Sequence, residues 1–76
     1  MELDPLNINY NSTILFNRAS AYQRLSKNVE AIADLTKATE MNEDYMKAFL
    51  KRGELHMLQK NYEEAVRDFE RVKALD

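Results

Sequence analysis

The stretch V-E-A-I-A-D-L-T-K-A at residues 29–38 returns as E-E-A-V-R-D-F-E-R-V at residues 63–72, 34 positions later. The same step continues upstream and pairs residues of like kind: Leu15 with Phe49, Arg18 with Arg52, Ala31 with Ala65, Asp34 with Asp68, Leu35 with Phe69. A fixed period of this length is typical of proteins built from repeated helical hairpins. The sequence therefore consists of two copies of one unit.

The scarcity of helix-breaking residues predicts an all-α fold. One Gly and one Pro occur among 76 residues, and no stretch shows the alternation of a β-strand. Apolar residues instead recur at helical spacing. We expect four antiparallel helices, stacked as a right-handed solenoid fragment, at about residues 9–26, 29–41, 45–59 and 62–75, with turns near Lys27, Glu43 and Lys60.

Two asparagines mark the expected starts of the second and fourth helices. Asn28 is predicted to be an N-cap, because its side chain can accept from the exposed N–H groups of the next turn. Asn61, followed three residues later by Glu64, resembles a capping box. The residues predicted to face the interior are Ile14, Leu15, Ala19, Tyr22, Leu25, Val29, Ile32, Leu35, Ala38, Phe49, Leu50, Gly53, His56 and Met57.

Gly53 falls inside the third predicted helix, where glycine costs about 1 kcal/mol relative to alanine. We therefore expect a close approach of the partner helix there, with Ala31 and Ala65 as the matching small residues of the two units. Val66, Phe69 and Val72 are expected to leave apolar surface on the last helix.

Composition excludes several classes of function. The net charge of −2 argues against nucleic-acid binding, which depends on neutralising phosphates. No apolar run approaches the roughly 18 residues of a membrane span, and no charged-then-apolar leader is present. The single histidine, His56, and the absence of cysteine leave no metal site, and no nucleophile with a base or phosphate loop is seen. We expect no enzyme, no cofactor and a cytoplasmic location.

The charges divide by helix. Residues 12–27 and 44–60, around the first helix of each unit, hold seven basic and two acidic residues, or +5. Residues 28–43 and 61–76 hold four basic and nine acidic residues, or −5. Because the first helices of stacked hairpins line the concave face, this division predicts a basic groove inside an acidic shell. The alternative interpretation is that these are ordinary solvent-exposed charges with no role in binding.

The 34-residue units resemble tetratricopeptide (TPR) repeats. The resemblance rests on an ordered set of small, aromatic and bulky apolar residues: Leu15, Ala19, Tyr22, Ala31, Leu35 and Ala38, then Phe49, Gly53, His56, Ala65, Phe69 and Val72. It implies repeats at residues 9–43 and 44–76, with residues 1–8 as the tail of a preceding repeat and a linker. Glu43 stands where the family usually has proline, and His56 where it usually has an aromatic residue.

Two sequence motifs make the resemblance more specific. F-N-R-A at residues 16–19, with Y-M-K-A-F-L-K-R-G at residues 45–53, is similar to the second and third repeats of the carboxylate-clamp TPR domains of co-chaperones. Y-E-E-A-V-R-D-F-E at residues 62–70 looks most like co-chaperones that also carry a J-domain. The resemblance implies an adaptor that binds the acidic C-terminal tail of a cytosolic heat-shock chaperone.

Carried over position by position, the resemblance assigns Asn17, Lys47 and Lys51 to peptide binding, and two further clamp positions to a preceding repeat. Lys51 stands where the family usually has arginine, so a two-pronged contact becomes a point charge. The rival reading is a structural segment that self-associates through its exposed repeat ends without binding peptide. Saturable, salt-sensitive peptide binding discriminates the first reading from the second.

Overall fold

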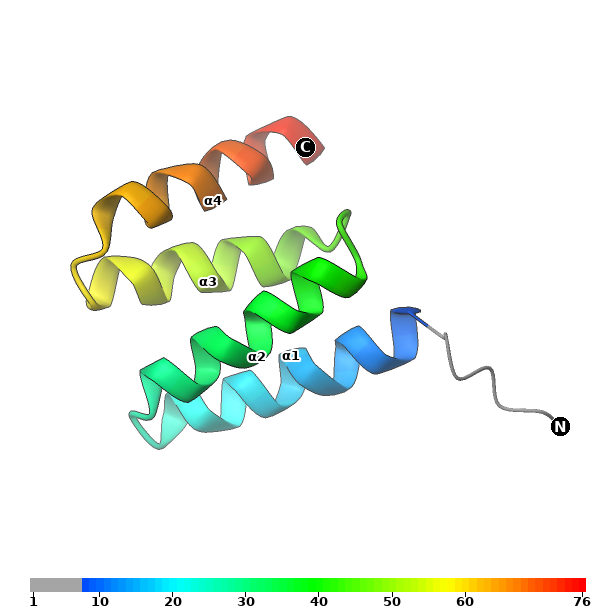
Figure 1. Cartoon of the computed structure of the whole chain (residues 1–76), viewed down its shortest axis with the longest axis horizontal. Helices are drawn as coiled ribbons and strands as arrows, with labels where there is room; N and C mark the ends of the chain where they lie inside the picture. Colours follow the sequence, from blue (N-terminus) through cyan, green and yellow to red (C-terminus); the bar gives the residue numbers. More distant parts are fainter. Residues whose placement is uncertain (1–7) are drawn as a thin grey trace, which may run out of the picture.

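Four helices form the described part of the chain. The computed structural model describes residues 8–76, and over these residues it contains no β-strand. The helices are α1 (Ile8–Arg24), α2 (Asn28–Met41), α3 (Met46–Leu58) and α4 (Tyr62–Leu75). Figure 1 shows them stacked in chain order, with neighbours antiparallel and α4 at one edge. The predicted fold class is confirmed, and each helix begins and ends within two residues of its predicted bounds.

The expected preceding-repeat tail at residues 1–8 lies outside the described residues, except for Ile8, which begins α1. Within residues 8–76, no helix combines the length and the apolar character needed to cross a membrane.

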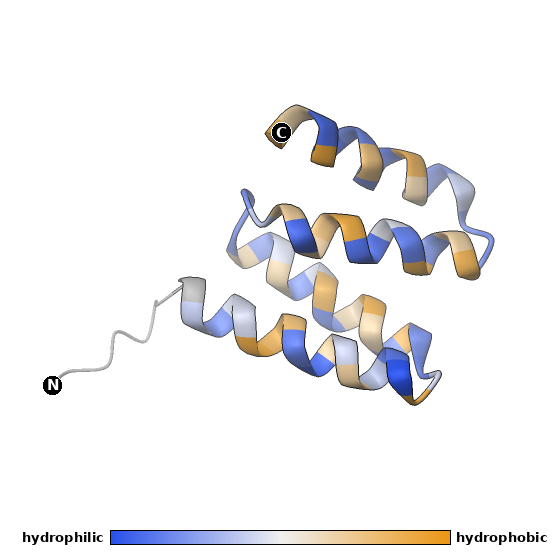
Figure 2. Ribbon diagram, turned by 180° about the vertical axis from the view of Figure 1, so that it is seen from behind, coloured by the Kyte–Doolittle hydropathy of each residue, from blue (hydrophilic) through white to orange (hydrophobic). Residues whose placement is uncertain are grey.

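The core is built mainly from alanine. The fully buried residues that form it come from the first three helices: Ala19, Ala31, Leu35, Ala38, Ala48 and Leu55. Half-buried side chains, including Leu15, Ile32 and Tyr45, pack around them. Small side chains let the helices approach closely, and the apolar residues form stripes on helices that are otherwise polar (Figure 2).

The close approach expected at Gly53 is confirmed, and a ring fills it. A Cβ atom at Gly53 would lie 2.7 Å from Cε1 of Phe69 on α4. Ala31 and Ala65 are both fully buried, as expected of the small faces. The side chain that requires glycine at residue 53 is therefore the phenyl ring of Phe69.

Both hairpin turns end their first helix in the same way. Ser26 and Lys60 adopt left-handed backbone, with φ of 61° and 63°. The Lys27 N–H donates to the Tyr22 carbonyl at 2.8 Å, and the equivalent N–H of Asn61 donates to the carbonyl of His56, also at 2.8 Å. This is the Schellman arrangement, which satisfies carbonyls at a helix C-terminus. It recurs after 34 residues, like the sequence.

The predicted caps are partly wrong. Lys27, and not Asn28, is the N-cap of α2, because its carbonyl accepts the first helical bond, from the Ala31 N–H at 3.0 Å. Asn61 is the N-cap of α4 as predicted, but its side chain makes no capping bond. The capping box is absent because the Asn61 amide lies 3.4 Å from Nδ1 of His56 instead.

The predicted interior is wrong at five positions. Ile14, Leu25, Val29, Leu50 and Met57 are exposed. Leu50 and Met57 lie on the side of α3 that no other described helix covers, whereas Leu55, on the side that faces the first repeat, is fully buried. Helical periodicity located an apolar stripe but not which of its edges a neighbour covers. Of the last-helix residues expected to leave apolar surface, Val66 is exposed, while Phe69 and Val72 are half-buried.

Candidate functional site

Two arginine–aspartate pairs join the helices within each repeat. Arg18 of α1 donates from Nε and Nη2 to the two carboxylate oxygens of Asp34 on α2, each at 2.7 Å. Arg52 of α3 donates in the same two-pronged way to Asp68 of α4, at 2.8 and 2.6 Å. Both aspartates are buried. A buried carboxylate is stable only with such partners, so these arginines fix the two helices of each hairpin together.

The second pair is part of a larger network. Nη1 of Arg52 also donates to the hydroxyls of Thr39 and Thr36 on α2, at 3.0 and 3.3 Å. Arg52 therefore contacts α2 and α4 from its place on α3. It joins the two repeats to each other as well as the two helices of the second repeat.

The ion pair between Arg18 and Asp34 changes the pKa of the arginine. The hydrogen bonding that Arg18 donates to Asp34, followed by the negative charge of that carboxylate, raises the pKa of the Arg18 guanidinium above its ordinary value. The pair with Asp34 therefore favours the charged form of Arg18. Two of the seven basic residues in the predicted groove, Arg18 and Arg52, have their charge matched by an aspartate, so the groove is less basic than the sequence count indicated.

The predicted binding residues lie on α1 and α3. Lys47 and Lys51 are one turn apart on α3. Nζ of Lys51 donates to Oε1 of Gln23 on α1, at 3.0 Å, so this lysine stands at the junction of the two helices. Asn17 is exposed on α1, and in the described part of the chain its side chain makes no hydrogen bond to either lysine. The structure therefore brings Lys51 to α1 but does not join the three predicted residues directly.

An aromatic pair lies beside Lys51. The rings of Phe16 on α1 and Tyr45, just before α3, have centroids 5.4 Å apart. Nζ of Lys51 lies 5.8 Å from the centroid of the Phe16 ring, within reach of a cation–π attraction. A cation, an amide and two rings thus meet where α1 adjoins α3.

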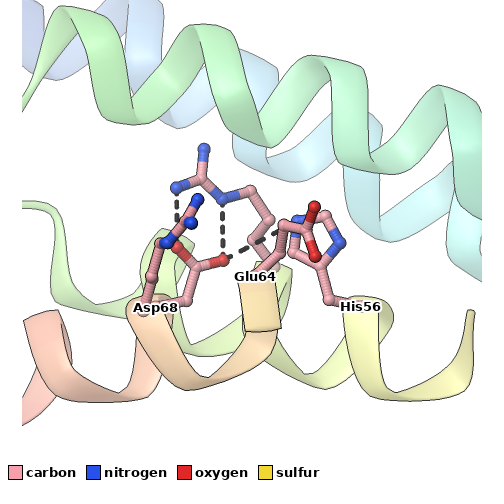
Figure 3. Close-up of a pocket in the computed structure, with 5 residues that line it drawn as sticks. His56, Glu64 and Asp68 are labelled. Atoms are coloured by element: carbon pink, nitrogen blue, oxygen red, sulfur yellow. Dashed lines mark hydrogen bonds and ion pairs between the residues drawn. The ribbon is translucent and has the colours of Figure 1, made fainter. Parts of the chain in front are cut away.

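A separate hollow of about 240 Å³ lies between α3 and α4. Its lining residues are Arg52, His56, Glu64, Arg67 and Asp68. Figure 3 shows His56 beside the carboxylates of Glu64 and Asp68, and Nε2 of His56 lies 4.0 Å from Oδ2 of Asp68. The hollow carries both signs of charge, and its most buried cation is already paired. It therefore has less to offer an anionic ligand than the lysines of α3.

His56, which the sequence predicts to face the interior, is half-buried. No cluster of three metal-ligating side chains exists among residues 8–76.

Sequence reasoning missed the arginine–aspartate pairs, although the sequence holds a signal for them. Each arginine is followed 16 positions later by an aspartate, and both members recur after 34 positions. A pair of opposite charges that recurs together in a repeat indicates a contact within the repeat. Counting charges by helix assigned the arginines to the groove instead. The aromatic pair could be found only from the way the repeats stack.

Hairpins that recur with the same turns, the same charged pair and the same small-residue crossing define a helical-repeat protein. The chain belongs to the tetratricopeptide repeat family: two family models, each described as a tetratricopeptide repeat, match residues 12–45 and 46–76. The resemblance seen in the sequence is confirmed.

Curated relatives share this segment. The chain is 41% identical over 76 residues to DnaJ homolog subfamily C member 7 homolog of Dictyostelium discoideum, covering all of the chain and 14% of that protein. It is 41% identical over 70 residues to human DnaJ homolog subfamily C member 7, covering 92% of the chain and 14% of the relative. Human RNA polymerase II-associated protein 3 is 41% identical over 76 residues, all of the chain and 11% of that protein.

The chain therefore spans only a small part of the relatives it matches. The predicted similarity to J-domain proteins with TPR repeats is confirmed by the DnaJ homologues. Family and relatives together support a protein-interaction role in a co-chaperone context.

Proposed function

We propose that the chain is a cytoplasmic adaptor that binds the acidic C-terminal tail of a heat-shock chaperone through Asn17, Lys47 and Lys51, without a cofactor. The similarity to DnaJ homologues supports a chaperone as the partner. The peptide would lie along the side of the molecule where α1 adjoins α3.

One observation carries the proposal: Arg18 of α1 and Arg52 of α3 are paired with aspartates, whereas the lysines of α3 are not. Within residues 8–76, neither Lys47 nor Lys51 forms an ion pair. The hydrogen bond of Lys51 goes to the neutral amide of Gln23. A carboxylate that replaced this amide would form a charge-assisted bond, which is roughly twice as strong as a neutral one.

The surroundings of Lys51 suit the end of a peptide chain. Lys47 places a second positive charge one turn away, and the exposed amide of Asn17 adds an uncharged donor on α1. The rings of Phe16 and Tyr45 supply apolar surface for a side chain next to the bound carboxylate. The site is open to solvent, so binding should be weak and should weaken further with salt.

A titration with a fluorescent chaperone-tail peptide tests the proposal. We expect saturable binding that is lost when the terminal carboxylate of the peptide is amidated. Losing one charge-assisted hydrogen bond costs on the order of 1.5–3 kcal/mol, so Lys47→Ala and Lys51→Ala should each weaken binding by about tenfold or more.

Lys60→Ala is the matched control, because Lys60 is an exposed lysine in the turn before α4, away from the α1–α3 junction. It should bind the peptide like the unaltered chain. Equal affinity of the Lys47 and Lys51 variants and the Lys60 control, with helicity retained, would contradict the proposed site.

A further inference from the structure

Two residues of α1 hold the side chain of Lys51 in place. Its Nζ donates to Oε1 of Gln23 at 3.0 Å and lies 5.8 Å from the centroid of the Phe16 ring. Gln23 and Phe16 are seven residues apart, so they lie on the same side of α1. Figure 2 shows α1 and α3 on the near side of the stack, with α2 behind them. The ammonium is thus positioned before a ligand binds, so less side-chain freedom is lost on binding.

The hydrogen bond to Lys51 fixes the orientation of the Gln23 amide. An ammonium can only donate, so the amide oxygen must face it, and the NH2 group lies at the side of this contact. Within residues 8–76, the NH2 group has no acceptor. Gln23 is only half-buried, so a ligand can reach its side chain. The amide therefore offers N–H donors beside the positive charge of Lys51.

The internal structure of a repeat does not require a glutamine at this position. The counterpart of Gln23, 34 positions later, is Met57, and the counterpart of Lys51, 34 positions earlier, is Asn17. The arginine–aspartate pairs, in contrast, occur in both repeats. The contact between Gln23 and Lys51 is therefore not part of the repeated framework. It occurs only at a residue predicted to bind the peptide.

We propose that Gln23 is a further ligand-binding residue, whose NH2 group and the Lys51 ammonium together hold one carboxylate of the peptide, with one oxygen on each nitrogen. This inference rests on the proposed function and adds a residue to the same site. The ammonium has three N–H donors and gives one to Gln23, so a carboxylate can join the pair without displacing the amide. Gln23 thus supplies the second donor that arginine would provide at residue 51 and lysine does not.

The pair of donors selects for a carboxylate. Two donors side by side match its two oxygens, as the fork of an arginine does. A primary amide in the place of the carboxylate keeps only one acceptor and brings its own NH2 group against a donor, which disfavours binding. Glutamate at residue 23 would also be unsuitable, because it would pair with Lys51 and offset the charge that attracts the peptide.

Titration of the fluorescent chaperone-tail peptide into Gln23→Met tests the proposal. Methionine is the residue of the second repeat at this position, and its side chain cannot donate a hydrogen bond. We expect binding about tenfold weaker, as for the loss of one hydrogen bond to a charged group. If the carboxylate instead displaced the amide, the substitution would leave the affinity unchanged or raise it. Gln59→Met, at the exposed end of α3, is the matched control and should bind like the unaltered chain.

A second peptide identifies the carboxylate. It keeps its free C-terminus and carries an amide in place of its last acidic side chain. If the pair holds the terminal carboxylate, Gln23→Met should weaken binding of this peptide as well. If the pair holds the acidic side chain, the effect of Gln23→Met should disappear. In either case, adding Lys51→Arg to Gln23→Met should restore most of the lost affinity, because the guanidinium supplies both donors.

Failure of this inference differs from failure of the proposed function. If Lys51→Ala weakens binding but Gln23→Met, with its helicity retained, binds as tightly as the unaltered chain, the role of Gln23 is overturned alone. A loss that arginine at residue 51 does not restore would also overturn it. A chain that binds no peptide would overturn both proposals. If Gln23→Met loses helicity, NMR of the unaltered chain replaces it: the side-chain amide protons of Gln23 should shift downfield with the peptide, and unshifted protons would overturn the inference.

Discussion

The phenyl ring of Phe69 occupies the space in which Gly53 would carry a side chain. A Cβ atom built on Gly53 would lie 2.7, 3.0 and 3.1 Å from three carbons of that ring, closer than carbon atoms pack. In the first repeat, the equivalent pair is Ala19 with Leu35, both fully buried. The second repeat pairs Gly53, which has no side chain, with the large ring of Phe69. The first repeat pairs the methyl group of Ala19 with the smaller side chain of Leu35. The volume at the crossing is shared differently in the two repeats.

Gly53→Ala should destabilise the chain, although alanine is the better helix former. The propensity gain is about 1 kcal/mol, but overpacking a filled crossing typically costs about 1–3 kcal/mol. We expect a net loss of about 1 kcal/mol in the free energy of unfolding, measured by urea denaturation monitored through helicity.

The double variant Gly53→Ala with Phe69→Leu, which copies the first repeat, tests the cause. It should recover most of the lost stability, because leucine leaves room for the new methyl group, whereas Phe69→Leu alone should leave a small void and lose about 1 kcal/mol. Additive effects of the two substitutions would show that Gly53 is not constrained by the ring.

The number and bounds of the helices in residues 8–76 followed from the sequence, because they depend on local patterns repeated twice. The exposure of Leu50 and Met57 could not be predicted from the sequence, because it depends on whether a neighbouring helix covers that side of α3. The cap at Asn28 failed for a related reason. Ser26 adopts left-handed backbone to end α1, and this fixes Lys27 as the first acceptor of α2. The three-dimensional path of the turn therefore decided the cap.

The candidate site was predictable only as single residues. The position-by-position resemblance identified Asn17, Lys47 and Lys51, and their part in peptide binding stays a prediction. The partners of Lys51 on α1, Gln23 and Phe16, are 28 and 35 positions away, so their proximity follows from the stacking of the repeats. The pairing of Arg52 with Asp68 removed a charge that the sequence count had given to the groove.

Arg52→Ala should be strongly destabilising. It would leave the carboxylate of Asp68, a buried residue, without its partner and remove the contacts to Thr36 and Thr39. Breaking a buried pair from one side costs about 3–5 kcal/mol, a large fraction of the stability of so small a domain.

Arg18→Ala provides the comparison, because the same two-pronged pair is made by a more exposed arginine. We expect a clearly smaller loss, since solvent screens the first pair more than the second. Thermal and urea unfolding of both variants measure the difference. Equal losses would mean that the links from Arg52 to α2 contribute nothing.

Lys51→Arg should strengthen peptide binding. A guanidinium can contact a carboxylate through two N–H groups, whereas an ammonium acts as a point charge. The ring of Phe16, 5.8 Å from Nζ, offers a surface on which the planar group can stack. We expect an affinity several-fold higher for the peptide with a free carboxylate and little change for its amidated form. A lower affinity for the free carboxylate would argue that Lys51 does not contact it.

Glycine at the two left-handed positions should stabilise the chain. Ser26 and Lys60 hold φ near 60°, where a residue with a Cβ atom is strained and glycine is not. Ser26→Gly and Lys60→Gly should each raise the free energy of unfolding by about 0.5–1 kcal/mol, less the extra flexibility that glycine gives the unfolded chain. Lys37→Gly, at an exposed position inside α2, is the control and should lose about 1 kcal/mol. If glycine at Lys60 lowered stability as it does at Lys37, the Schellman turn would not be the feature that ends α3.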